Sequence, residues 1–190
     1  MKSKITHTAS LFLAGWQQTI VRQDLPLIVK CLQQLSEEEI WWRPNAASNS
    51  AGNLVLHLCG NVRQWIIAGL GGAAFKRERD LEFAERGPIP RKELVTRLRR
   101  TVRDAGRVIP KLTDESLARK FRIQGYHVTG LEAAFHVASI SVITPARSST
   151  SRNTRVVTIC DSRGCPWLSP KQNNSAPRLS WKRGTGFSGC

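Results

Sequence analysis

The chain has 190 residues, a hydrophobic content of 41% and a formal net charge of +15. This length is enough for one domain with a buried core, and the composition is typical of soluble globular proteins. The apolar run ASLFLAGW near the N-terminus is too short to cross a bilayer and lacks a small-residue cleavage pattern. We therefore expect a cytoplasmic protein without membrane contact.

The positive charge is unevenly distributed along the chain. Residues 1–139 contain 21 Lys and Arg against 13 Asp and Glu, whereas residues 140–190 contain 8 against 1. The last segment is rich in Ser, Gly and Pro without any period, a composition typical of disordered chain that binds polyanions without specificity. The charge therefore does not indicate a specific nucleic-acid site.

The five cysteines do not follow a metal-binding pattern. Cys31 and Cys59 fall on predicted helix faces, where a buried thiol behaves as a small apolar side chain. The spacing of Cys160 and Cys165 in CDSRGC is unlike that of a zinc knuckle.

Apolar residues at helical spacing predict two helices in the first part of the chain. The first covers about residues 11–35, where Pro26 either kinks the helix or starts its second half. The second follows AASNS, in which Ser48, Asn49 or Ser50 can act as the N-cap, and it ends at a Gly-Gly pair.

A third helix is predicted over residues 91–112, beyond the charged connector KRERDLEFAERGPIP. Pro90 stands where a helix start favours proline. The outward face carries five arginines, for which we favour a solvated face over nucleic-acid binding: Arg97, Arg99, Arg100, Arg103 and Arg107.

The fourth helix is predicted to start at Thr129, because Thr129 and Glu132 have the spacing of a capping box. Pro145 removes a backbone donor and crowds the preceding turn, so this helix is truncated and irregular chain is expected to follow. Three apolar side chains are expected to face the core: Leu131, Phe135 and Ala138.

Four helices joined by modest loops predict an all-α protein, an antiparallel four-helix bundle. We expect an N-terminal extension over residues 1–19, the bundle over residues 20–144, and a basic, disordered tail over residues 145–190.

Two stretches, LSEEEIWWRPNAASNSAGNLVLHLCGNVRQWI and IQGYHVTGLEAAFHVAS, carry a dense family resemblance over about residues 20–139. They are similar to the DinB-like superfamily of four-helix bundles, and within it to the DUF1572 branch, which is related to YfiT-type metal-dependent hydrolases. The resemblance implies a divalent metal, Zn, Ni or Fe, held by three histidines. The first is expected in NLVLHLCGN, where this chain has His57.

The other two histidines of the family come from a pattern H-x-x-x-H-x-G-Q in the last helix, where imidazoles four residues apart share one face. In this chain Ile140 and Thr144 stand at those positions. With suitable synonymous codons, one added C after the codon of Ser139 makes the bases of residues 140–151 read H-F-S-Y-H-T-G-Q-I-I-H-I. Our hypothesis is a single-base deletion or sequencing slip beside Ser139, which makes the tail out of frame.

The resemblance implies a metal-dependent hydrolase or low-molecular-weight thiol transferase with a small-molecule substrate, impaired here because two of the three ligands are missing. We keep two alternatives open: a non-catalytic helical module, which includes a homodimer formed through its faces, and a basic nucleic-acid-binding protein. Metal analysis separates the first reading from the other two.

The remaining histidines and polar residues have structural alternatives. His136, one turn before Ile140, could substitute as a ligand, but we favour His57 and His136 as inward histidines satisfied by hydrogen bonds. Solvated positions are expected for His7 and His127. Trp41 and Trp42 are expected to be loop residues that cover the end of the bundle. Asn61 and Arg63 are expected either to orient the second nitrogen of a metal-binding histidine or to have a plain solvent or capping role.

Overall fold

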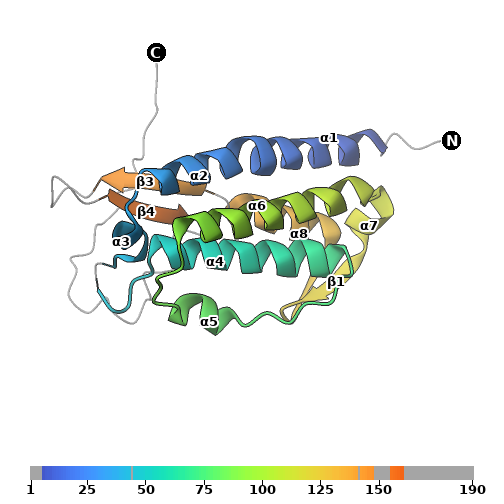
Figure 1. Cartoon of the computed structure of the whole chain (residues 1–190). Helices are drawn as coiled ribbons and strands as arrows, with labels where there is room; N and C mark the ends of the chain where they lie inside the picture. Colours follow the sequence, from blue (N-terminus) through green and yellow to red (C-terminus); the bar gives the residue numbers. More distant parts are fainter. Residues whose placement is uncertain (1–5, 44, 141, 148–154, 161–190) are drawn as a thin grey trace, which may run out of the picture.

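Four long helical segments form the body of the protein in this computed structural model, which describes residues 6–43, 45–140, 142–147 and 155–160 (Figure 1). The result confirms the predicted helical bundle. The first segment consists of α1 (Thr6–Gln17), η1 (Gln18–Asp24) and α2 (Leu25–Gln33), and the second of α4 (Ala51–Val62) and η2 (Arg63–Leu70). The third consists of α6 (Arg91–Val108) and η3 (Ile109–Lys111), and the fourth is α8 (Gly130–Ile140).

The second and third segments run in the same direction, opposite to the first segment and to α8 (Figure 1). This arrangement arises because the connector after η2 returns along the length of the bundle before α6 begins. The connector contains a short helix, α5 (Arg79–Ala84), which packs against α4. The sequence pattern did not predict α5.

Side chains that cap the helix starts explain where several helices begin. Ser50 accepts a hydrogen bond from the backbone of Asn53 and is the N-cap of α4, one of the three caps expected there. The predicted capping box of α8 is also present, since Thr129 N donates to Glu132 at 2.7 Å and Glu132 N donates to Thr129 at 3.2 Å. Similar reciprocal caps start α3 (Glu37–Trp41) and α7 (Asp114–Ala118).

The first helix starts earlier than the sequence pattern predicted. It begins at Thr6, so the boundary expected at residue 20 lies inside the helical segment. Trp16 is buried and its Nε1 donates to the carbonyl of Ala134 in α8 at 3.1 Å. Part of the expected N-terminal extension therefore belongs to the bundle. Pro26 lies in the first turn of α2, immediately after a wider π-helical stretch.

The side of α8 that faces the core differs from the prediction. Leu131 and Phe135 were expected to point inward, but they are 46% and 58% exposed, whereas Ala138 packs partly buried against the core as predicted. The buried side chains of α8 are Ala133, Ala134 and Val137. Small residues face inward because α8 lies close to the first helix, where Trp16 reaches the backbone of Ala134.

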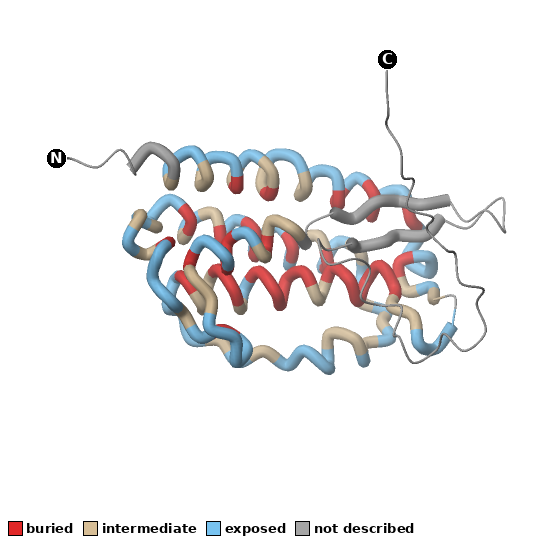
Figure 2. Tube along the Cα trace, turned by 180° about the vertical axis from the view of Figure 1, so that it is seen from behind, coloured by how far each residue is buried: buried red, intermediate tan, exposed pale blue. Residues whose placement is uncertain are grey.

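The third segment follows its amphipathic pattern. The five arginines expected on its outward side are all exposed. Arg97 forms an ion pair with Glu93 of the same helix, and Arg107 forms one with Asp104. The buried side chains of this segment are Leu94, Leu98, Thr101, Val102, Ala105 and Ile109. Figure 2 shows the buried residues concentrated where the long helices meet.

Two antiparallel hairpins complete the described structure. β1 (Lys120–Ile123) and β2 (Tyr126–Thr129) join through Gln124 and Gly125, which both have positive φ, as a two-residue hairpin turn requires. β3 (Val142–Arg147) pairs with β4 (Arg155–Cys160), so these two stretches are strands and not the irregular chain that we expected after α8. The rest of the predicted disordered tail, residues 148–154 and 161–190, lies outside the described residues.

A membrane span is absent from the part of the chain that the structure describes, because none of its helices combines sufficient length with sufficient apolar character.

Candidate functional site

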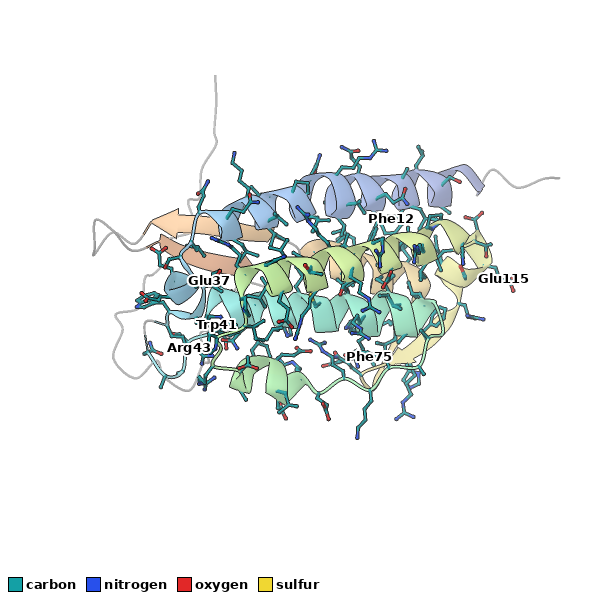
Figure 3. The ribbon with its side chains drawn as sticks, in the orientation of Figure 1. Phe12, Glu37, Trp41, Arg43, Phe75 and Glu115 are labelled. Carbon is teal, nitrogen blue, oxygen red and sulfur yellow. The ribbon has the colours of Figure 1, made fainter. Side chains whose placement is uncertain are left out.

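The start of α4 is tied to the far end of the α5 connector through one buried amide. Asn53 is fully buried, and its Nδ2 donates to the carbonyls of Glu82 and Glu85 at 2.8 and 2.9 Å. Arg43 donates to Asn53 and, at 2.7 Å, to the carbonyl of Glu85. Arg43 and Trp41 lie beside the start of α4 (Figure 3). These contacts hold α5 against α4 in a fixed register.

One turn further along α4, His57 meets a carboxylate from α5. The Nδ1 atom of His57 lies 3.0 Å from Oε2 of Glu82, and both side chains are largely buried. The ring of Phe83 lies against the imidazole with a centroid distance of 4.7 Å. The carboxylate and the phenyl ring together set the orientation of His57.

A buried arginine holds the same carboxylate from the other side. Arg77 donates from Nε to Oε1 of Glu82 and from Nη2 to Oε2, both at 2.7 Å, which is the bidentate geometry of a strong ion pair. Its side chain is only 3% exposed. Its remaining contacts include Gln64 Oε1 at 3.1 Å and the backbone carbonyl of His57 at 3.2 Å.

Gly60 makes room for this arrangement. A Cβ atom at position 60 would lie 1.8 Å from Oε1 of Glu82 and 2.9 Å from Nε of Arg77. Any side chain at this position would therefore displace the carboxylate or the guanidinium group.

The electrostatics of the pair follow from burial and from these contacts. Burial lowers the pKa of His57, and the positive charges of Arg77 and Arg79 add to this effect, while the hydrogen bond with Glu82 opposes it. Burial works to raise the pKa of Glu82, but the hydrogen bonds from Arg77 and His57 outweigh it and hold that pKa below its usual value. The carboxylate is thus ionised and the imidazole neutral at pH 7.

One turn after His57, the same helix carries a second polar group of residues, next to α8. Asn61 is buried, and its Nδ2 lies 3.3 Å from Nε2 of His136 in α8. The rings of Trp65 and His136 lie 4.1 Å apart. Asn61 Oδ1 and Trp65 Nε1 are buried without a hydrogen-bond partner. A third such atom is Asp24 Oδ2 in the first helix, where burial raises the pKa of the carboxyl to about 6.

Of the residues considered for the metal site, the structure describes the side chains of His57 and His136, and these contact different neighbours. Ile140 ends α8 and Thr144 lies in β3, but their side chains are outside the described residues, as is that of His7. His57 contacts the α5 side and His136 contacts Asn61 and Trp65. Among the described residues, no three His, Cys, Asp or Glu side chains lie close enough together to hold a metal.

The outlying candidates are placed as follows. His127 is exposed on β2, as expected, and Trp42 is 45% exposed. Trp41 packs on Gly52 and Gly87 and donates to the carbonyl of Ile89 at 3.1 Å. Arg63 lies over the ring of Phe75, 4.7 Å from its centre (Figure 3).

Sequence reasoning missed the residues that surround His57. Glu82, Arg77 and Gly60 lie in or opposite the connector, which has no helical period and was read only as charged. The available signal was Gly60, three residues after His57, together with the acidic and basic residues that are concentrated in the connector.

A protein-family model described as a protein of unknown function (DUF1572) matches residues 8–142. The match therefore covers the four helical segments and ends at the first residue of β3. No curated protein matches the chain.

Proposed function

The chain belongs to the DUF1572 family, and we propose that its bundle is the framework of a metal-dependent enzyme whose site is incomplete in this chain. The proposed chemistry is that of a hydrolase or a low-molecular-weight thiol transferase acting on a small molecule. The observation that carries the proposal is His57, a buried imidazole oriented by a buried carboxylate at 3.0 Å. Histidines that bind metals typically have such a carboxylate behind them.

The residues present do not fit a catalytic metal. A catalytic zinc has three protein ligands and an open position. Of the three expected ligands, this chain retains His57, while Ile140 and Thr144 offer no imidazole. We therefore derive no reaction step for the chain as written and propose that it does not hold Zn, Ni or Fe tightly.

The two unpartnered polar atoms beside α8 support a shifted reading frame as the cause. Asn61 and Trp65 both contact His136 of the helix whose sequence changes after Ser139, and buried polar groups without partners are rare in native proteins. The family match also ends at Val142, close to the proposed shift. Both observations are expected if the fourth helix originally continued with polar residues.

The test compares the chain as written with a version in which one C is inserted after the codon of Ser139. Both proteins are incubated with Zn, Ni or Fe, separated from free metal, and analysed for bound metal. We expect about one equivalent in the restored protein and none in the chain as written. The substitution His57→Ala in the restored protein should abolish binding.

Two results would contradict this proposal. A restored protein without bound metal would show that the bundle is not a metal-site framework. One tightly held equivalent in the chain as written would show that its site is complete.

A second candidate function is that of a non-catalytic module that associates through α8. It is favoured by the exposure of Leu131 and Phe135, which lie one turn apart on that helix. Sedimentation analysis of the chain and of the double variant Leu131→Ser, Phe135→Ser tests it. A dimer that the double variant loses supports association, and a monomeric parent chain contradicts it.

A further inference from the structure

The contacts of His57 pose a question about which ring nitrogen carries the proton. Nδ1 lies 3.0 Å from Oε2 of Glu82, which can only accept a hydrogen bond, and also 3.0 Å from Nη2 of Arg77, which can only donate one. A neutral imidazole nitrogen cannot satisfy both neighbours. It donates to Glu82 if it is protonated, and it accepts from Arg77 if it is not.

The hydrogen atoms of Arg77 decide between the two. Nη2 of a guanidinium group carries two hydrogens. One is directed to Oε2 of Glu82 at 2.7 Å, and the other has two possible acceptors, Nδ1 of His57 at 3.0 Å and the backbone carbonyl of His57 at 3.2 Å. The Nε hydrogen is used by Oε1 of Glu82. If Nδ1 accepted from Nη2, no hydrogen would lie between Nδ1 and Oε2 of Glu82, which are only 3.0 Å apart. If Nδ1 instead donates to Oε2, the second Nη2 hydrogen still has the backbone carbonyl of His57 as its acceptor, so the geometry favours Nδ1 as the donor.

We infer that Glu82 is a positioning residue that holds His57 in the Nδ1–H tautomer, so that the lone pair lies on Nε2. Arg77 fixes the carboxylate through two hydrogen bonds, and Gly60 leaves the space in which the carboxylate lies. The inference rests on the proposed function only in that a metal at this site would be bound through Nε2, the nitrogen that carries the lone pair in this tautomer. A histidine buried only for packing needs neither a fixed tautomer nor a second charged residue behind its partner.

The tautomer can be measured in the chain as written by long-range ¹H–¹⁵N NMR of the histidine rings at pH 8. We expect His57 to show a protonated Nδ1 and an unprotonated Nε2, with a preference of roughly tenfold or more, as a charge-assisted hydrogen bond provides. The opposite tautomer in the parent chain would overturn the inference.

The variant Glu82→Gln removes the charge and keeps the shape. We expect His57 to change to a mixture of tautomers, while His136 keeps its ring signals and so reports that the fold is intact. Glu85→Gln is the matched control, because the Glu85 carboxylate bonds to the backbone of Arg86 and Gly87 and not to His57. An unchanged His57 tautomer in Glu82→Gln would also overturn the inference.

The NMR test of the His57 tautomer and the metal-binding test of the restored protein can fail independently of each other. Failure of the restored protein to bind metal leaves the NMR result unaffected and contradicts only the metal proposal. The opposite tautomer of His57 leaves metal binding by the restored protein unaffected and contradicts only the role of Glu82.

Discussion

The second helical segment carries two polar groups of residues, one next to α5 and one next to α8, and they differ in how their polar atoms are satisfied. On the side of α5, Asn53 makes paired contacts with the connector, and His57, Glu82 and Arg77 form one hydrogen-bonded cluster. On the side of α8, Asn61 Oδ1 and Trp65 Nε1 are buried without partners beside His136.

The difference follows the position of the partners in the sequence. The partners on the α5 side come from residues 77–85, inside the family match and before Ser139. On the α8 side, the neighbouring helix ends at Ile140, one residue after the proposed frame shift. A buried polar atom without a partner costs about 1–3 kcal/mol. The residues next to α8 therefore destabilise the fold in a way that the hydrogen-bonded cluster next to α5 does not.

Of the changes proposed, restoring the reading frame after Ser139 should alter the free energy of unfolding most. Extending α8 buries several apolar side chains, each worth about 1.5–3 kcal/mol, so the free energy of unfolding should rise by roughly 5 kcal/mol or more. Urea denaturation followed by circular dichroism measures it. A chain that ends at Ser139 is the control, and equal stability of this truncated chain and the restored protein would contradict the prediction.

Removing Arg77 from the hydrogen-bonded cluster next to α5 should change the free energy of unfolding by nearly as much. Arg77→Met leaves the carboxylate of Glu82 buried without its main partner, which should lower the free energy of unfolding by about 3–5 kcal/mol. The matched control is Arg97→Met, which removes an exposed ion pair with Glu93 and should cost less than about 1 kcal/mol. Equal losses in the two variants would show that burial of the Arg77 pair has no special weight.

At Gly60, the lack of space for a side chain should affect stability more than the low helix propensity of glycine does. Gly60→Ala places a Cβ atom against Glu82 and should destabilise the protein by about 1–3 kcal/mol, because the close contact forces side chains to shift. Gly106→Ala, in a helix with no atom near the new Cβ, should stabilise by roughly 0.5–1 kcal/mol. Thermal denaturation separates the two, and a stabilising effect at both positions would disprove the steric role of Gly60.

The buried carboxyl of Asp24 should produce an effect no larger than that of Gly60→Ala, and one that depends on pH. Burial raises its pKa from 3.8 to about 6, so the folded protein binds this proton more tightly than the unfolded chain. The contribution to stability is complete below about pH 3.8 and is lost as the pH rises through about 6. Asp24→Asn should therefore raise the free energy of unfolding by roughly 1–3 kcal/mol at pH 8 and have little effect at pH 4. Denaturation at both pH values measures this difference, and an equal gain at both would exclude ionisation as the cause.

Features that depend on neighbours in the sequence were predicted well. The caps at Ser50 and Thr129 and the buried face of the third segment need only residues three or four positions apart, so the local pattern was sufficient. The inward face of α8 was predicted wrongly at Leu131 and Phe135 but correctly at Ala138, because the pattern favours the largest apolar residues. Close approach to Trp16 selects the alanines instead.

The sequence by itself determined the helices, their caps, and the absence of two expected imidazoles, since these depend on residue identity and short spacing. Only the tertiary structure decided that Glu82, 25 residues after His57, becomes its partner and that Arg77 holds this carboxylate. The reason is physical: burial away from water makes a pairing of charged groups over such a separation specific, and a connector without a period does not show in advance which of its charges will be buried.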